Sequence, residues 1–195
     1  METNSIVIEF KNVSVRLESK DILSNVSFTV PEGGKVALTG KSGAGKSSIL
    51  YALLGLLIPT AGEILFERRK VDVTSIDYVR SSVAYIGQEP VLGNVSTVRE
   101  ALMLPFDFKA NRRQRPYNAT VKKNLALLEL PAGILKSTIN TISGGEKQRV
   151  AICRGLLQKK QLFLLDEVTS ALDRESAQAV RSEEHTSELQ SLLII

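Results

Sequence analysis

Apolar and polar residues alternate along the N-terminal part of this chain. Val26, Phe28 and Val30 are separated by single polar residues, which is typical of a strand with one buried face. Polar turns divide the same region into short runs, and such runs favour antiparallel pairing. The runs predicted to be strands are residues 6–10, 13–17 and 22–30.

From residue 35 onward, short apolar runs alternate with segments of helical period. The predicted strands are 35–39, 63–67, 83–86 and 161–167, and the predicted helices are 48–54, 76–80, 98–104 and 118–130. In the last of these helices, Val121, Leu125 and Leu128 would share one face. We therefore expect an α/β fold, with an antiparallel β subdomain near the N-terminus and a helical insertion at about residues 91–141.

Composition limits the partners that the chain can have. With 195 residues, of which 43% are hydrophobic and 24% charged, it is long enough for one domain with a large core. The formal net charge is +4, but no aromatic-rich basic stripe accompanies it, so we predict no nucleic-acid partner. The basic stretch 109–116 is interpreted as a solvated loop rather than a phospholipid or nucleic-acid patch. Cys153, the single cysteine, excludes an internal disulfide, and its apolar neighbours predict a buried thiol.

The chain shows no sign of a membrane span or a leader. No run of 18 apolar residues is present, and the first residues lack a basic segment followed by an apolar one. Any membrane role is therefore expected to come through a partner.

One glycine-rich stretch carries the strongest chemical signal. Residues 40–47 read G-K-S-G-A-G-K-S and fit the pattern G-x-x-x-x-G-K-[ST], with a predicted strand before them and a helix after them. This arrangement collects backbone N–H groups and the positive end of a helix around one anion. Lys46 would then reach the β- and γ-phosphates, and Ser47 would bind Mg²⁺. The alternative is a glycine-rich loop without a ligand. The expected nucleotide-binding residues are Gly40, Lys41, Ser42, Gly43, Ala44, Gly45, Lys46, Ser47 and Ser48.

Two carboxylates end an apolar run farther along. Asp166 and Glu167 follow Leu162–Leu165, and such a pair is costly to bury unless a positive charge faces it. Mg²⁺ on a triphosphate would supply that charge, with Asp166 as its ligand and Glu167 accepting a proton from the attacking water. Gln88 follows another predicted strand, which would place its amide at the sheet edge beside the phosphates.

A second glycine pair lies at a predicted helix start. Ser143 is a suitable N-cap, and Glu146 completes a capping box three residues later. Gly144 and Gly145 would leave backbone N–H groups open to an anion. A plain capped helix is the alternative for this stretch taken alone.

Taken together in this order, the motifs resemble the ATP-binding subunits of ABC transporters. Ser170–Asp173, which follow the carboxylates, match the D-loop of that family, and the resemblance covers about residues 6–180. It implies an ABC-type P-loop NTPase core that binds ATP and Mg²⁺ and hydrolyses ATP. It also implies a head-to-tail dimer with a second ATP-binding subunit, in which Ser143, Gly144 and Gly145 contact the γ-phosphate held by the other subunit's Lys46. Gln88 would act as a catalytic and metal-binding sensor of that phosphate.

The same resemblance implies a transmembrane permease as partner, with this chain peripheral at the cytoplasmic face of the inner membrane. The blocks 93–102, 104–106 and 130–135 further resemble bacterial ATP-binding subunits assigned to iron export. A soluble ABC ATPase in DNA repair or translation is the alternative, and a regulatory protein without turnover is a third. A single cassette with a short helical insertion favours transport.

Three features depart from the family pattern. Ile142 and Glu146 stand where the commonest form of the signature has Leu and Gln. Leu17 stands where the family usually places an adenine-stacking aromatic residue. Residues 181–191 match the in-frame translation of a sequencing-adapter oligonucleotide, so we interpret residues 1–180 as the ATP-binding domain and 181–195 as a non-native tail on a C-terminally truncated fold. A genuine divergent tail is the alternative. His185 lies in this polar tail and is not assigned as the family's switch histidine. We expect the last residues to be disordered or only loosely packed.

Overall fold

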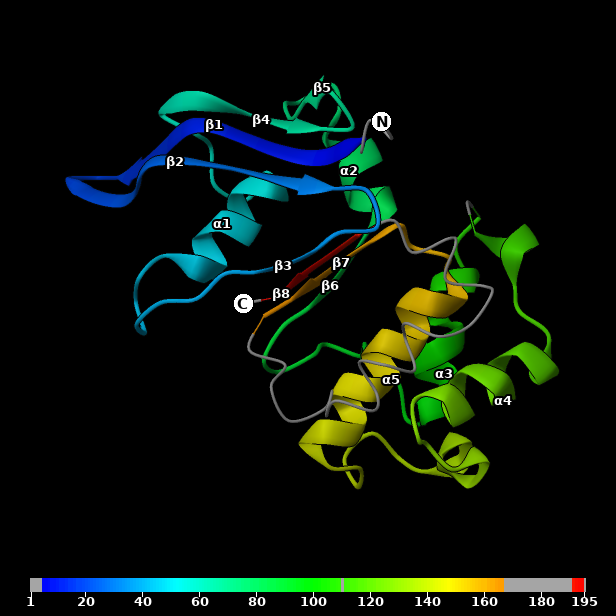
Figure 1. Ribbon diagram of the computed structural model, residues 1–195. Helices are drawn as coiled ribbons and strands as arrows, with labels where there is room; N and C mark the ends of the chain where they lie inside the picture. Colours follow the sequence, from blue (N-terminus) through cyan, green and yellow to red (C-terminus); the bar gives the residue numbers. More distant parts are fainter. Residues whose placement is uncertain (1–4, 110, 167–190, 195) are drawn as a thin grey trace. The chain divides into compact units, whose positions relative to one another are not determined.

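The computed structural model describes residues 5–109, 111–166 and 191–194 (Figure 1). These residues divide into two units, each defined by its internal contacts. The first unit contains 5–83, 161–166 and 191–194, and the second contains 84–109 and 111–160.

An antiparallel sheet forms much of the first unit. Its strand order is β2-β1-β4-β5, which confirms the predicted N-terminal β region. The prediction of two strands at 6–10 and 13–17 is wrong, because the structure has one continuous strand there. The four strands are β1 (Ile6–Leu17), β2 (Lys20–Pro31), β4 (Ala61–Phe66) and β5 (Arg69–Lys70).

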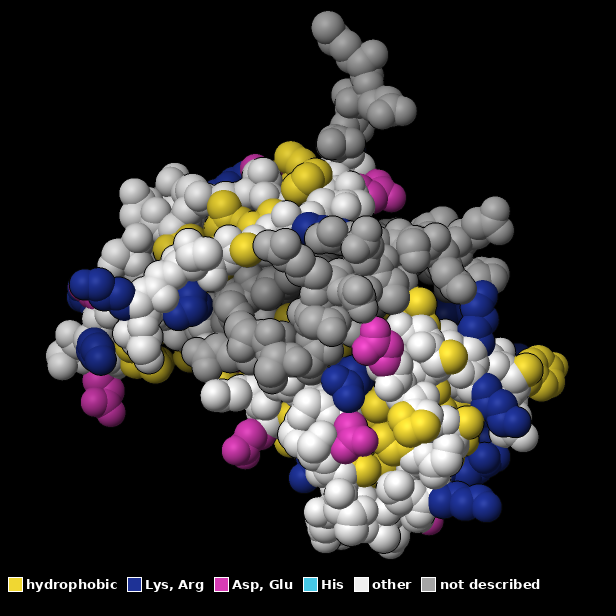
Figure 2. Space-filling view, turned by 60° about the horizontal axis from the view of Figure 1, so that its bottom comes forward, with side chains coloured by type: hydrophobic (Ala, Val, Ile, Leu, Met, Phe, Trp, Pro, Cys, Tyr) yellow, Lys and Arg dark blue, Asp and Glu magenta, His cyan; other side chains and the backbone are white. Residues whose placement is uncertain are grey.

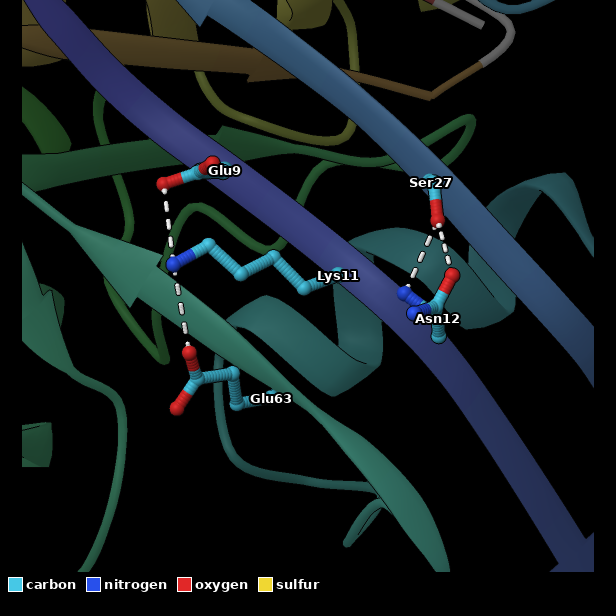
Figure 3. Close-up of polar contacts among 5 residues, drawn as sticks. All are labelled: Glu9, Lys11, Asn12, Ser27 and Glu63. Atoms are coloured by element: carbon cyan, nitrogen blue, oxygen red, sulfur yellow. Dashed lines mark hydrogen bonds and ion pairs between the residues drawn. The ribbon is translucent and has the colours of Figure 1, made fainter.

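A bulge at Asn12 explains why β1 continues where a turn was expected. Asn12 takes a left-handed conformation, with φ 50°, and the register of β1 shifts against both of its neighbours at this point. Its backbone N–H donates to the Ser27 hydroxyl at 2.8 Å, and that hydroxyl donates to the Asn12 side chain at 3.0 Å (Figure 3). Beside it, Lys11 lies 3.2 Å from Glu63 and 3.5 Å from Glu9. These contacts hold both sides of the bulge, so the strand bends without ending.

The second sheet has the strand order β3-β8-β7-β6. Strand β8 runs parallel to both of its neighbours, β3 and β7. The expectation that the last residues are loosely packed is therefore wrong for the backbone of 191–194. Strand β3 is shorter than predicted, and Val36 and Leu38 beside it are half-buried. The strands are β3 (Lys35–Ala37), β6 (Val83–Ile86), β7 (Leu162–Leu165) and β8 (Ser191–Ile194).

The core of the first unit includes side chains from two helices, α1 (Lys46–Leu53) and α2 (Ile76–Ser82), as well as from the strands. Side chains from β1, β2, β4, α1, α2 and β7 belong to one buried cluster. Phe10 and Phe28 stack within it, with ring centroids 4.6 Å apart. Burial of such apolar surface contributes about 25 cal/mol per Å², and here it fixes α1 against the antiparallel sheet.

Helices dominate the second unit, as predicted. Its α-helices are α3 (Val98–Met103), α4 (Asn118–Leu127) and α5 (Gly144–Leu157), and its 3-10 helices are η1 (Leu104–Phe106), η2 (Arg112–Gln114) and η3 (Ala132–Lys136). Hydrogen bonds from Val98 N–H to the Ser137 carbonyl (3.1 Å) and from Ile139 N–H to the Ser96 carbonyl (3.0 Å) close the base of the segment that carries α3 and α4.

The side chains predicted to be buried in this unit are buried. Val121, Leu125 and Leu128 are at most 4% exposed, although Leu128 lies just beyond the end of α4. Phe106 on η1 is fully buried as well. Cys153 on α5 is also buried, and desolvation raises the pKa of its thiol to about 12. This thiol is a packing group, as the sequence indicated.

Candidate nucleotide site

The glycine-rich loop 40–47 connects β3 to α1. Gly43 and Gly45 have φ values of 78° and 86°, a conformation that costs other residues energy. A Cβ on Gly45 would also lie 2.9 Å from the Ile22 carbonyl oxygen and 3.0 Å from the Leu23 side chain. Glycine at position 45 is therefore needed both for the backbone turn and for the close approach to β2.

Helix α1 begins without a side-chain cap. Its N-cap is Gly45, which offers no acceptor, and no acidic residue lies in its first turn. The first N–H groups of a helix have no partner within the helix and carry its positive dipole end. An anion at this point would satisfy them, so the helix start suits a phosphate.

Lys46 keeps its ammonium group over the loop. Its Nζ donates to the carbonyls of Gly40 at 3.1 Å and Lys41 at 3.2 Å. The side chain is therefore folded back toward the first residues of the loop instead of extending into solvent. This places a cation beside the uncapped N–H groups, where both attract the same anion.

Two residues far apart in the sequence meet next to this loop. The Ser47 hydroxyl at the start of α1 donates to Asp166 Oδ1 at 3.1 Å, across a separation of 119 residues. Asp166 directly follows β7 and is 6% exposed. A hydroxyl and a carboxylate are oxygen ligands of the kind that Mg²⁺ prefers. The two predicted metal ligands in the first unit are thus within reach of one ion, and the donor set fits Mg²⁺.

The start of α5 in the second unit is capped, as predicted. The Ser143 hydroxyl accepts from Glu146 N–H at 3.2 Å, and the Glu146 carboxylate accepts from Ser143 N–H at 2.7 Å. The backbone N–H of Ser143 holds the pKa of Glu146 below its ordinary value. Gly144 is exposed and a Cβ there would meet nothing within 4 Å; Gly145 is half-buried.

Two contacts between α5 and the segment after β6 were not predicted. Gln148 Nε2 donates to the Gln88 carbonyl at 3.0 Å. Arg154 donates to the carbonyls of Val91 at 2.8 Å and Leu92 at 3.1 Å, and burial lowers the pKa of its guanidinium. Both donors lie on a helix whose neighbouring residues are apolar and buried. Polar residues within such a pattern were the signal that could have revealed these contacts.

The described residues hold only part of the predicted site. The glycine-rich loop, Ser47 and Asp166 belong to the first unit, whereas Gln88 and Ser143–Gly145 belong to the second. The side chain of Gln88 is exposed. Leu17, at the end of β1, is 50% exposed. Glu167, Ser170–Asp173 and His185 lie outside the described residues.

Within the same described residues, no helix has both the length and the apolarity to cross a bilayer.

Comparisons with known proteins identify the family of the chain. The family model described as "ABC transporter" matches residues 23–170. The "probable iron export ATP-binding protein FetA" of Escherichia coli (strain K12) is 35% identical over 185 residues, which cover 95% of this chain and 80% of that protein. The "ATP-dependent lipid A-core flippase" of Haemophilus influenzae (strain Rd KW20) is 35% identical over 90% of this chain, but the match spans 31% of the flippase.

Among solved structures, a bacterial Atm1-family ABC exporter with ATP bound superposes with a TM-score of 0.80 at 28% identity. The match covers 100% of this chain and 35% of the exporter chain. This chain therefore spans most of FetA but about a third of the flippase and of the exporter.

Proposed function

Because this chain belongs to the ABC transporter family, as a nucleotide-binding ATPase domain, we propose that it hydrolyses Mg-ATP at the loop 40–47 to drive a separate membrane permease. The observation that carries the proposal is the contact between Ser47 and Asp166, 3.1 Å apart beside the uncapped start of α1. A hydroxyl, a carboxylate, a lysine and open N–H groups at one place are what a metal-bound triphosphate requires.

Each residue of the first unit has a distinct task in this proposal. The backbone of residues 40–45 surrounds the phosphates, and Lys46 exchanges its two carbonyl partners for the β- and γ-phosphate oxygens. Ser48, in the first turn of α1, contributes to the same phosphate contacts. Ser47 and Asp166 hold Mg²⁺. When bound, Mg²⁺ neutralises part of the triphosphate charge.

Residues outside the first unit would complete the reaction. Glu167 accepts the proton of the attacking water, and Gln88 orients that water and contacts the metal. Ser143, Gly144 and Gly145 bind the γ-phosphate held by a second copy of the subunit, so that two ATP molecules lie between two subunits. The exposed, unobstructed start of α5 at Gly144 supports this role, since a phosphate could approach its backbone.

The separate permease is supported by the match to a relative that is itself named as an ATP-binding protein. The match with FetA spans 80% of an ATP-binding protein, whereas the flippase and the exporter are about three times as long as the part matched here. In this proposal the chain is a peripheral ATP-binding subunit on the cytoplasmic face of the membrane. The name of FetA makes iron the first cargo to test. Co-expression with the product of the neighbouring open reading frame tests the partner: a stable complex with a membrane protein is expected, and failure to co-purify would favour a soluble ABC ATPase.

Lys46→Ala tests the nucleotide site itself. Removing the ammonium deletes a charge-assisted contact worth roughly 1.5–3 kcal/mol, so ATP affinity should fall about 10- to 100-fold. Lys70→Ala, an exposed lysine on β5, is the matched control and should bind ATP like the parent chain. Equal ATP affinity of Lys46→Ala and Lys70→Ala in a calorimetric titration would rule out this site.

Glu167→Gln tests the proposed base in the complete transporter subunit. The amide is similar in size but cannot accept the proton of water, so ATP binding should persist while turnover is lost. Binding is followed by titration and turnover by phosphate release. A variant that hydrolyses ATP at the parent rate would remove Glu167 from this role and leave the binding site intact.

A further inference from the structure

We propose that the loop formed by residues 107–109 and 111–117, here named the basic loop, docks onto the surface of a bilayer that contains anionic lipid. The inference uses the membership of the chain in a transporter family, but not the ATP site, because every residue involved lies in the second unit. The basic loop follows η1, includes η2 and ends at the N-cap of α4.

Charge is the first observation. The basic loop contains Lys109, Arg112, Arg113 and Arg115, but Asp107 as its only acid. Asp107 is engaged with Arg115 at 3.1 Å, and in the part of the chain that the structure describes no ion pair involves the other three cations. All of these side chains are exposed. Figure 2 shows Lys and Arg side chains gathered at the right-hand edge of the view.

Exposed aromatic residues are the second observation, and they separate the basic loop from an ordinary solvated loop. Phe108 is 64% exposed and Tyr117 is 84% exposed, while Phe106, two residues before Phe108, is fully buried. An aromatic ring in water beside arginines gains free energy at a bilayer interface, where the ring is buried and the cations meet lipid phosphates. A loop that contacts only water does not require either exposed ring.

Local hydrogen bonds hold the basic loop in shape before any partner binds. Arg115 pairs with Asp107 across its base, and Asn111 Nδ2 donates to the Pro105 carbonyl at 3.1 Å. The N–H groups of Asn111 and Arg112 both donate to the Phe108 carbonyl, at 3.0 and 3.1 Å. Such a loop loses little conformational entropy on docking, so its cations and rings are presented together.

The bilayer is favoured over nucleic acid by the nature of this surface. Proteins that bind single strands line a groove with successive aromatic platforms, whereas here two rings flank a loop that closes on itself. A transporter subunit also works beside a membrane. We therefore assign the basic loop to anionic headgroups, with Lys109, Arg112 and Arg113 supplying the charge and Phe108 and Tyr117 the apolar contact.

Vesicle co-sedimentation tests the assignment with the 195-residue chain and no nucleotide. We expect binding to vesicles of equal parts phosphatidylcholine and phosphatidylglycerol, little binding to pure phosphatidylcholine, and weaker binding as salt is raised from 50 to 300 mM. Arg112→Gln combined with Arg113→Gln should lower the partition coefficient about 30-fold, from about fivefold for each cation near an anionic surface.

A matched control carries the same change of charge elsewhere. Arg68→Gln with Lys70→Gln removes two exposed cations of the first unit and should leave vesicle binding within about threefold of the parent. Phe108→Ser should weaken binding at both salt concentrations, because its contribution is apolar. ATP affinity, measured on the same samples, should not change in any of these variants, so a failure here is distinct from a failure of the nucleotide site.

Three outcomes would overturn the proposal. One is equal binding to vesicles with and without phosphatidylglycerol, and another is equal loss in the basic-loop and control variants. The third is binding of a single-stranded oligonucleotide that depends on Arg112 and Arg113 while vesicle binding does not, which would assign the basic loop to nucleic acid.

Discussion

Two helices of this protein, α1 and α5, begin at glycine-containing turns, but only α5 has a side-chain N-cap. Helix α1 starts at Gly45, in a left-handed conformation and with no side-chain cap. Helix α5 starts at Ser143, where a complete capping box with Glu146 satisfies two backbone N–H groups. A good N-cap typically contributes about 1 kcal/mol. The backbone N–H groups at the start of α1 therefore lack a side-chain cap, whereas Ser143 and Glu146 provide one at the start of α5.

This difference separates two kinds of phosphate contact. At α1 the first backbone N–H groups gain a partner only when an anion binds. Anion binding therefore also stabilises the start of this helix. At α5 the helix is complete beforehand, and a phosphate would use backbone groups that the box leaves over. We infer that loop 40–47 is the primary nucleotide site and that Ser143–Gly145 is a secondary contact. Four predictions test this contrast.

Mg-ATP should stabilise the two helix starts unequally. At a concentration 100 times its dissociation constant, a ligand that binds only the native state raises the free energy of unfolding by about 2.7 kcal/mol. Hydrogen exchange should show new protection at residues 45–48 and little change at 144–147, because the latter are already capped. Equal protection at both starts of the monomeric chain would contradict the contrast.

Replacing Gly45 and replacing Gly144 with alanine should lower the free energy of unfolding by very different amounts. Gly45→Ala places a Cβ at φ 86° and 2.9 Å from the Ile22 carbonyl oxygen, so we expect a loss of about 2 kcal/mol in stability together with weaker ATP binding. Gly144→Ala meets nothing within 4 Å and should change stability by less than about 1 kcal/mol. Urea unfolding of both variants measures the difference; similar losses would show that the loop is not strained as described.

Removing the cap of α5 should lower stability without affecting the primary site. Ser143→Ala is expected to cost about 1 kcal/mol and to leave the ATP affinity of the monomeric chain unchanged. Thr97→Ala is the matched control, because Thr97 and Glu100 form the same capping box at α3 and should give a similar loss. A large fall in ATP affinity in Ser143→Ala monomers would make α5 a primary site after all.

The smallest effect concerns pH. Hydrogen bonds from Ser143 hold the pKa of Glu146 below its ordinary value of 4.5. A lowered native-state pKa means that the carboxylate stabilises the fold above the unfolded pKa and that this contribution is lost as the pH falls through the native value. The melting temperature of Glu146→Gln should therefore be below that of the parent at pH 6 and approach it below pH 4. A constant gap across this range would show that the charge of Glu146 does not contribute.

Short-range features were predictable because the interacting residues are neighbours in the sequence. The capping box needs only Ser143 and Glu146 three residues apart, and the glycine-rich loop needs only its own spacing between a strand and a helix. The buried face of α4 followed from helical period in the same way, through Val121, Leu125 and Leu128. Family, fold class and the ATPase assignment all rested on patterns of this kind.

The tertiary structure decided what depends on packing between distant segments. It brought Ser47 to Asp166 across 119 residues, and it placed Arg154 against the carbonyls that follow β6. It also kept β1 continuous through Asn12, because Ser27 on the neighbouring strand satisfies the bulge, and it paired 191–194 as a strand between β3 and β7. No local pattern encodes these contacts, since their partners are chosen by the shape and burial of the whole core.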